Sequence, residues 1–281
     1  MRSLKKRIKE TDEDMCGIVG CVVVNHPSQV RDNFYKLLVA SQIRGQDGTG
    51  IAFSDHTTKR WNKKASDISI EEIPGFHEGD IIIGQNRLAI FGLDHRNDQP
   101  ITDNDFAIVH NGNLLNFEQK FKDLSLKREY EVDTELILRL VESHKDIKQT
   151  KSKILNKMMR ESLIGIAVQN AEDQLEGDYA CLMIDYKDRK LIAFRKYKPL
   201  YIYADKDALY WFSTLQIGLK VFQPPVNTFF DPITGREQKS IGIWEVPRSQ
   251  IHIASIGGLY FHDKKPEDDK TLMNIFNSNT Q

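Results

Sequence analysis

The chain has 281 residues, 40% of them hydrophobic, which suits one large domain with its own core better than two unrelated modules. Lys and Arg (39) nearly balance Asp and Glu (40), so the net charge of −1 gives no electrostatic reason to expect nucleic acid or an anionic membrane as the main partner. No apolar run approaches the length of a transmembrane helix, and the first fourteen residues lack the apolar segment of a secretory signal.

The first half of the chain alternates strand-like runs with one helix. Residues 1–15 are charged and predicted to be a mobile leader or a mis-annotated extension. Ser28 is a candidate cap for a helix running to about Ile43, and a glycine-punctuated loop spans Arg44 to Gly50. The buried face of the helix is expected to carry Phe34, Leu37, Leu38 and Ser41. Apolar and β-branched runs predict strands at Cys16–Val24, Ile51–Ser54, Ile81–Arg87 and Phe106–His110.

The second half begins with helices and continues as strands. Asp133 heads an amphipathic helix, DTELILRLVESH, and a lysine-rich stretch leads into a second helical segment ending near Gly177. Short runs separated by turn residues then predict antiparallel strands rather than βαβ units. These runs are Tyr179–Tyr186, Leu191–Arg195, Leu200–Tyr203, Leu209–Ser213, Ile241–Val246 and Ile251–Ala254. The pattern favours an α+β fold of two antiparallel sheets with outer helices, and residues 263–281 are expected to be a flexible polar tail.

Cysteine usage indicates a reducing compartment. Cys16, Cys21 and Cys181 are too few and too irregularly spaced for a disulfide framework or a zinc site. We therefore expect a cytoplasmic protein with no metal and no other cofactor. Cys21 and Cys181 stand in apolar runs and are expected to be small buried hydrophobic side chains.

Cys16 is the most informative residue because it begins a strand and precedes glycine, so its sulfur can project while a small neighbour leaves room for a substrate. A lone Cys-Gly pair is a weak signal. Four further pieces strengthen it: Arg44-Gly45 before the glycine loop, Arg87 closing a strand, Asn111-Gly112 closing another, and Asp133 opening a helix.

Taken together, these pieces resemble the class II, or N-terminal-nucleophile (Ntn), glutamine amidotransferase domain of asparagine synthetase and glucosamine-6-phosphate synthase. They occur in the order that the family has, from Cys16 to Lys220. The matching segments are MCGIVG, RGQDGTGIA, GQNRLAI, QPI, VHNGNLLN, DTELI, LEGDYACLMID, RKYKPLYIY and FSTLQIGLK. The resemblance implies a four-layer αββα sandwich over residues 16–262 and hydrolysis of glutamine to glutamate and ammonia through a thioester.

The resemblance also implies a role for each matching residue. Cys16 would be the nucleophile and its own α-amino group the base, since a free amino terminus titrates at about 7.7–8.0 and an amide nitrogen has no such basicity. Cys16 would therefore act only as the first residue of the chain. The family's oxyanion donors correspond to Asn111 and Gly112, and a substrate carboxylate would bind Arg87. The remaining assignments are Asp133 for the substrate ammonium, and Arg44, Gly45 and Leu88 as further substrate-binding residues, with backbone contacts around the nucleophile from Arg44-Gly45.

Simpler structural roles remain open for several of these residues. Asn111-Gly112 between apolar runs is ordinarily a turn, Asp133 could be only a helix cap, and an isolated Arg87 would more often lie on the surface. His95 and His110 are candidate bases, but they are interpreted as structural because the family already has a base. The loops around Asp47 and Asp98 are read as turns, and no carboxylate–histidine cluster indicates a metal.

The chain departs from the family pattern in three places. Gln85 stands where the family usually has a histidine, and Gln46 replaces the proline of the usual RGPD. Fourteen residues precede Met15, whereas family members typically begin at Met-Cys. Translation from Met15 or autocatalytic removal of a leader would each expose Cys16, and a retained leader would leave the domain inactive. We favour an exposed Cys16.

The ammonia acceptor is expected on another polypeptide. About sixty residues follow Lys220, and they contain no phosphate-binding loop, pyrophosphatase signature or sugar-isomerase domain. The expected partners are therefore glutamine and an ammonia-accepting protein, with no nucleic acid and no membrane. Two alternatives remain: a catalytically silent glutamine-binding or scaffold module, and an N-terminal-cysteine hydrolase of another amide. The pairing of Arg87 with Asp133 favours an amino-acid substrate over that second alternative.

Overall fold

The computed structural model describes residues 16–88, 95–145, 153–223, 227–230, 237–240 and 242–264. One antiparallel sheet has seven strands in the order β13-β9-β10-β1-β4-β2-β3. Strand β1 lies near its middle, paired with β10 on one side and with β4 on the other. The strands are β1 (Gly17–Val23), β2 (Gly48–Phe53), β3 (Thr58–Trp61), β4 (Ile81–Arg87), β9 (Tyr201–Ala204), β10 (Ala208–Phe212) and β13 (Ile243–Glu245).

The second antiparallel sheet has six strands in the order β15-β14-β8-β7-β6-β5. Its longest pairing joins β6 to β7 along the whole length of both strands. The strands are β5 (Ile101–Thr102), β6 (Phe106–Leu114), β7 (Gly177–Asp185), β8 (Lys190–Arg195), β14 (Gln250–Ser255) and β15 (Gly258–Asp263). A separate hairpin joins β11 (Asn227–Phe230) to β12 (Glu237–Ser240).

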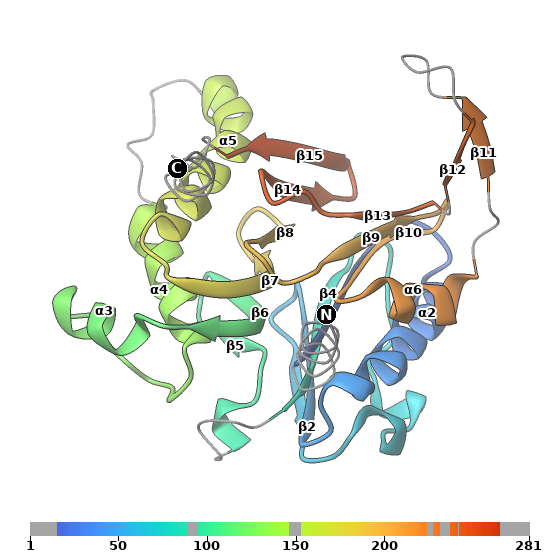
Figure 1. Ribbon diagram of the computed structural model, residues 1–281, viewed down its shortest axis with the longest axis horizontal. Coiled ribbons are helices and arrows are strands. Elements are labelled where there is room, and N and C mark those ends of the chain that lie inside the picture. The colour runs from blue at the N-terminus through green and yellow to red at the C-terminus, as the bar shows by residue number, and fades with distance from the viewer. Residues whose placement is uncertain are drawn as a thin grey trace, which may run out of the picture.

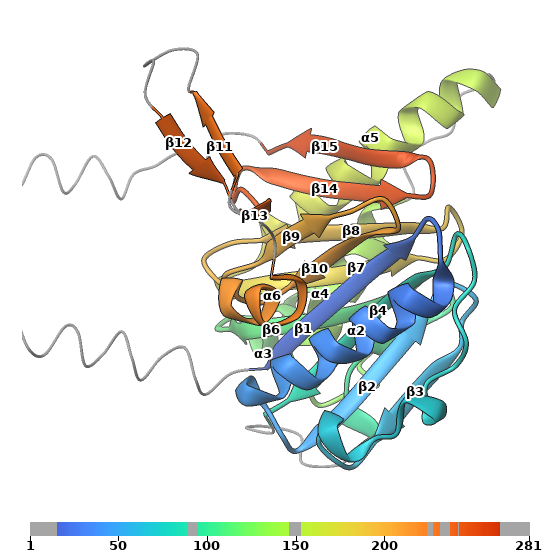
Figure 2. The ribbon, with the colours of Figure 1, turned by 90° about the vertical axis from the view of Figure 1, so that its right-hand side faces the viewer.

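Helices cover the outer faces of the two sheets, which gives four layers (Figures 1 and 2). Three buried clusters fill the spaces between the layers: α2 and α6 on the seven-stranded sheet, one sheet on the other, and α4 and α5 on the six-stranded sheet. Alternate side chains of β1 divide between the first two clusters, as a strand buried on both faces requires. The helices are α2 (Pro27–Ser41), α3 (Phe117–Asp123), α4 (Thr134–His144), α5 (Lys153–Glu172) and α6 (Leu215–Phe222).

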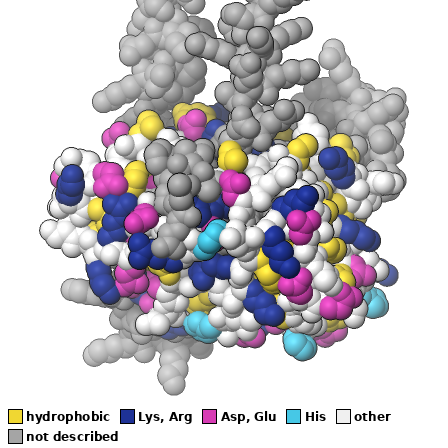
Figure 3. Space-filling model, turned by 90° about the horizontal axis from the view of Figure 1, so that it is seen from below, with side chains coloured by type: hydrophobic (Ala, Val, Ile, Leu, Met, Phe, Trp, Pro, Cys, Tyr) yellow, Lys and Arg dark blue, Asp and Glu magenta, His cyan; other side chains and the backbone are white. Residues whose placement is uncertain are grey.

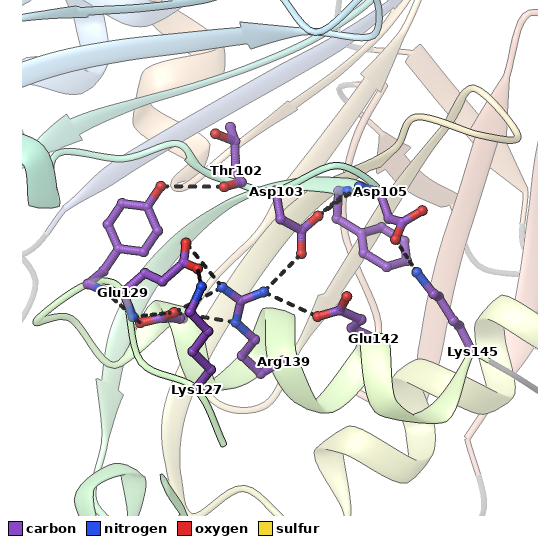
Figure 4. Close-up of polar contacts among 11 residues, drawn as sticks. Thr102, Asp103, Asp105, Lys127, Glu129, Arg139, Glu142 and Lys145 are labelled. Carbon is purple, nitrogen blue, oxygen red and sulfur yellow. Dashed lines mark hydrogen bonds and ion pairs between the residues drawn. The ribbon is translucent and has the colours of Figure 1, made fainter. Parts of the chain in front are cut away.

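Helix α4 is fixed to its sheet by charge as well as by apolar packing. Arg139 makes ion pairs with Asp103 beyond β5 and with Glu135 and Glu142 on its own helix, at 3.2–3.5 Å (Figure 4). The Arg139 side chain is only 14% exposed, so these pairs lie largely out of water and are screened less than surface pairs. These pairs hold the middle of α4, at Arg139, against the sheet.

The predicted α+β class and the αββα arrangement are confirmed. The helix expected from Ser28 to Ile43 is α2, and the four side chains predicted for its buried face are buried. Its N-cap is His26 rather than Ser28, because Pro27, whose ring fixes a helical φ, occupies the first helical position. The loop predicted to run to Gly50 is wrong at its end, since β2 already begins at Gly48.

Several elements were not predicted from the sequence. Strand β6 does not end at His110 but continues through Asn111 and Gly112 to Leu114, because β7 supplies ladder partners over that whole length. The strand β15 runs to Asp263, the first residue of the predicted tail. The leader at 1–15 and the tail beyond 264 lie outside the described residues.

None of the helices in the described ranges is both long and apolar enough to cross a membrane. On the face shown in Figure 3, basic and acidic side chains are interspersed.

Candidate active site

A cavity of about 450 Å³ opens between the two sheets, where the start of β1 and the end of β4 face the end of β6 and the start of β7. Its size is that of small-molecule sites. Five of the residues predicted for the site line it: Cys16, Arg87, Leu88, Gly112 and Asp133. The remaining lining residues are Gln99, His110, Asn113, Leu115, Phe117, Glu131, Val132, Gly177, Asp178 and Lys198.

The Cys16 sulfur lies against the backbone of Leu88. Its Sγ is 3.4 Å from the Leu88 backbone nitrogen, which donates to it, and 3.8 Å from the Leu88 carbonyl oxygen. Burial raises the pKa of the Cys16 thiol, although the Leu88 N–H acts in the opposite direction. A thiol in this setting stays protonated at neutral pH and needs a nearby base to become a nucleophile.

Arg44 and Gly45 support the Cys16 end of the cavity from behind and do not line it. Arg44 is buried, and its Nε donates to the Cys16 carbonyl oxygen at 3.2 Å. A Cβ atom at Gly45 would collide with the backbone of Arg87 and Leu88, so glycine allows the two segments to touch. Both residues therefore fix the backbone of the cavity wall on either side of the sulfur.

Arg87 is the last residue of β4 and is 6% exposed, so the alternative of a surface arginine is wrong. Its Nη1 forms an ion pair with the Asp98 carboxylate. Asp98 is itself 2% exposed, so its carboxylate is buried although it lies in the loop expected from the sequence. The pair places a buried guanidinium group at the cavity wall with its charge compensated from behind.

The end of β6 presents backbone donors toward the cavity. The His110 N–H donates to Gln99 Oε1 at 2.6 Å, and the Leu114 N–H donates to Asp133 Oδ2 at 2.8 Å. Because N–H groups alternate in direction along a strand, the Gly112 N–H lies on the same side, between these two. Gly112 has a φ of +148°, and a Cβ atom there would collide with the Asp178 carbonyl oxygen. Glycine is thus required at this position, and the alternative that Asn111-Gly112 is only a turn is wrong, because both residues lie within β6.

Asn111 lies beside this edge but does not line the cavity. Its side chain is fully buried, and neither its Nδ2 nor its Oδ1 has a hydrogen-bond partner in the part of the chain that is described. An unpaired buried amide costs about 1–3 kcal/mol, so this group is the clearest candidate for a partner that arrives with a ligand.

Asp133 is the N-cap residue of α4, yet its carboxylate makes no capping hydrogen bond. It accepts from the Leu114 N–H and lies 3.5 Å from His110 Nδ1. Burial alone would raise the pKa of Asp133, but His110 and the Leu114 N–H together hold it below the ordinary value. The carboxylate is therefore ionised at neutral pH and faces the cavity, which a purely capping role does not explain.

Sequence reasoning missed several residues of the cavity wall. Gln99 belongs to the QPI segment, and it bridges the His110 N–H and the Thr134 hydroxyl, the latter at 2.7 Å. His110 lines the cavity, and its Nε2 has no hydrogen-bond partner among the described residues, whereas the sequence was read as giving it only a structural role. Glu131 and Lys198 belong to connections between elements. Lys198 lies in the matching segment RKYKPLYIY but was not assigned to the site, and the sequence around Glu131 carries no signal for one. Among the described residues, no group of three His, Cys, Asp or Glu side chains could hold a metal ion.

Comparison with known proteins gives related results from sequence and from structure. Residues 85–220 match the family described as glutamine amidotransferase domain. The chain is 28% identical over 198 residues to the glutamine–fructose-6-phosphate aminotransferase (isomerizing) of Sulfurisphaera tokodaii, a match that covers 67% of this chain and 31% of that protein. It is 30% identical over 210 residues to the amidophosphoribosyltransferase of Methanocaldococcus jannaschii, covering 70% and 41% respectively.

Among solved structures, the glutamine phosphoribosylpyrophosphate amidotransferase from B. subtilis superposes with a TM-score of 0.64 at 20% identity. The superposition covers 90% of this chain and 50% of that one, and it supports the fold. The chain therefore spans less than half of the length of the curated relatives described above.

Proposed function

The chain carries a class II glutamine amidotransferase domain, and from this premise we propose that it hydrolyses glutamine to glutamate and ammonia through a γ-glutamyl thioester on Cys16. The observation that carries the proposal is the shared cavity: Cys16, Gly112, Arg87 and Asp133 line it together. A nucleophile, an oxyanion donor and a receptor for each charge of an amino-acid head group are the parts that this reaction requires.

In the proposed first half-reaction, the free α-amino group of Cys16 takes the thiol proton and the sulfur attacks the γ-carboxamide carbon. The carbonyl oxygen gains negative charge, which the Gly112 N–H and the Asn111 amide stabilise. One such donor is typically worth about 2.7–4 kcal/mol of the barrier. The C–N bond then breaks, and the proton held by the α-amino group passes to the leaving ammonia.

In the second half-reaction, a water molecule gives a proton to the same amino group and its oxygen attacks the thioester carbon. The C–S bond breaks, glutamate leaves, and the thiol recovers its proton. Arg87 would hold the substrate α-carboxylate and Asp133 the α-ammonium throughout. This chemistry needs a reduced thiol, so we place the reaction in the cytoplasm.

The test compares the full chain with a chain started at Met15, from which methionine removal exposes Cys16. Intact mass and N-terminal sequencing establish the first residue of each sample, and glutamate release is then assayed on the same samples. We expect activity only where Cys16 is first, and its loss in Cys16→Ala. A sample proven to begin at Cys16 that releases no glutamate would instead support a silent glutamine-binding module.

We further propose that a separate synthase or synthetase protein consumes the ammonia. The supporting observation is that two relatives, of which the chain matches 31% and 41%, are named for transfer reactions. Ammonia released into water would be largely protonated and lost as a nucleophile. We expect weak glutaminase activity from the chain alone and a higher rate in its native complex. Full turnover by the isolated chain would contradict the idea of a partner.

A further inference from the structure

Asp98 is a buried carboxylate that the glutaminase chemistry does not use directly. It lies between the 3-10 helix His95–Asn97 and β5, and it is 2% exposed. It does not line the cavity, but it contacts Arg87, which does. Buried carboxylates are rare unless they are paired, and a pair at the edge of a cavity constrains the partner that faces the ligand.

Three further contacts hold the Asp98 carboxylate and backbone in place. Its Oδ2 lies 3.0 Å from His95 Nδ1, and its backbone carbonyl accepts a hydrogen bond from Arg60 Nε at 2.7 Å. The carboxylate also packs over β2 where Gly48 lies, since a Cβ atom there would approach Oδ2 to 3.0 Å. A side chain larger than hydrogen at position 48 would push the carboxylate away. These contacts therefore fix the position of the Asp98 carboxylate that pairs with Arg87.

We propose that Asp98 is a positioning residue that orients the Arg87 guanidinium for the α-carboxylate of the substrate, an inference that rests on the proposed glutaminase function. A guanidinium group is planar and offers donors in a fixed fork, so a bond at one nitrogen sets the direction of the others. Preorganisation of this kind lowers the entropy lost when the substrate binds. Asp98 is therefore expected to affect the binding of glutamine and not the chemical step. The reacting γ-carboxamide carbon lies at the opposite end of the substrate from the α-carboxylate that Arg87 would hold.

The proposal differs from simple competition, in which Asp98 would neutralise Arg87 and weaken substrate binding. An uncompensated guanidinium buried at the cavity wall is costly in the substrate-free protein. Asp98 compensates the charge of Arg87 before the substrate binds. The guanidinium therefore need not reorganise when the substrate carboxylate arrives. Competition and positioning predict opposite changes in KM when the charge of Asp98 is removed.

The experiment uses Asp98→Asn in the protein whose first residue is Cys16, with the rest of the chain unchanged. Asparagine is chosen because it keeps the shape of the aspartate side chain and one acceptor oxygen. We expect KM for glutamine to rise about tenfold or more, by analogy with metal sites, where losing the partner of a metal ligand costs about tenfold or more in affinity or activity. We expect kcat to change less than about threefold, since the interaction is the same in the ground and transition states. An unchanged or lower KM would overturn the proposal.

Two comparisons separate positioning from general damage. Glutamine α-amide lacks the carboxylate that Arg87 would bind, so the ratio of kcat/KM for glutamine over this analogue should fall in Asp98→Asn. Equal losses on both substrates would also overturn the proposal. The matched control is Asp103→Asn, which removes another carboxylate paired with an arginine, here Arg139 at 3.5 Å, outside the cavity (Figure 4). It should lower stability and leave both KM values unchanged.

Failure of the proposed function is distinguishable from failure of this inference. If the wild-type chain binds glutamine without hydrolysing it, calorimetry replaces kinetics, and Asp98→Asn should weaken the affinity by the same factor. An Asp98 variant with unchanged affinity would overturn the inference alone. Thermal unfolding of each variant identifies any sample that is not folded at the assay temperature, and Asp98→Glu then serves as the charge-retaining comparison.

Discussion

The Leu114 backbone N–H donates a hydrogen bond of 2.8 Å to the carboxylate of Asp133. This bond joins the start of α4 to the end of β6, the strand that carries Asn111 and Gly112. The residue proposed for the substrate ammonium is therefore tied directly to the residues proposed for the oxyanion. A shift at either end of the cavity would be transmitted to the other.

Asp133→Asn should weaken glutamine binding and lower stability at neutral pH. The charge that would receive the α-ammonium is lost, so we expect KM to rise about tenfold or more, which corresponds to about 1.4 kcal/mol or more. A hydrogen bond to a charged group is worth about 1.5–3 kcal/mol, so unfolding in urea at pH 7 should also require less denaturant.

The pH dependence of this stability loss has a definite sign. The pKa of Asp133 is lowered in the folded chain, so the ionised carboxylate stabilises the fold above the ordinary value of 3.8. That contribution is lost as the pH falls through the lowered pKa. The difference in unfolding free energy between wild type and Asp133→Asn should narrow over that range. A difference that stays constant with pH would contradict this account.

Asn111→Leu should slow catalysis strongly without weakening the fold. Both amide atoms of Asn111 are buried without partners among the described residues, and such unpaired polar atoms destabilise the folded state. Leucine has no polar atoms to desolvate, so it removes this destabilisation. We expect the melting temperature to stay the same or rise, while kcat falls about 10²–10³-fold. Asn97→Leu is the control, since Asn97 is equally buried but bonds to Glu131 at 2.8 and 3.1 Å. That variant should lose stability.

Gly112→Ala should disrupt the proposed oxyanion site. The positive φ and the nearby Asp178 carbonyl oxygen leave no room for a Cβ atom, so the strand must shift and carry the Gly112 N–H with it. We expect kcat to fall about 10²-fold or more. Gly75→Ala is the matched control, because nothing lies within 4 Å of the added Cβ. Equal activity in the two variants would exclude Gly112 from the chemistry.

The local part of the fold could be predicted from the sequence, because hydrophobic period and turn residues act over short distances. The buried face of α2, with Phe34, Leu37 and Leu38, follows from its helical spacing, and β4 was predicted with its observed bounds. The continuation of β6 to Leu114 could not be predicted. Asn and Gly are poor strand formers, and the groups that satisfy this edge come from Gln99 and Asp133, distant in sequence.

The partners of the site residues could not be read from the sequence for the same reason. Asp98 stands in an Asn-Asp-Gln-Pro segment that is typical of a turn, and its burial depends on Arg87 at the end of another strand. Family resemblance identified the residue types at the cavity, including Cys16 and Arg87. It carried no information about which groups would support them from behind.

His252→Leu should remove part of the acid sensitivity of the fold. His252 is 3% exposed, lies edge-on to Phe261 with ring centroids 4.8 Å apart, and has no partner for either ring nitrogen in the described part of the chain. Burial lowers its pKa from 6.5 to about 4. The unfolded chain therefore binds a proton that the folded chain does not between these values, and stability falls as the pH drops from 6.5 toward 4. Between pH 7 and pH 4.5 this one group should cost wild type about 2 kcal/mol, measured by urea unfolding, and the leucine variant should lack that loss. The control is His77→Gln, at a side chain that is 83% exposed, and it should lose as much unfolding free energy over this pH range as wild type does. If His252→Leu also loses as much as wild type, the acid sensitivity belongs to other groups.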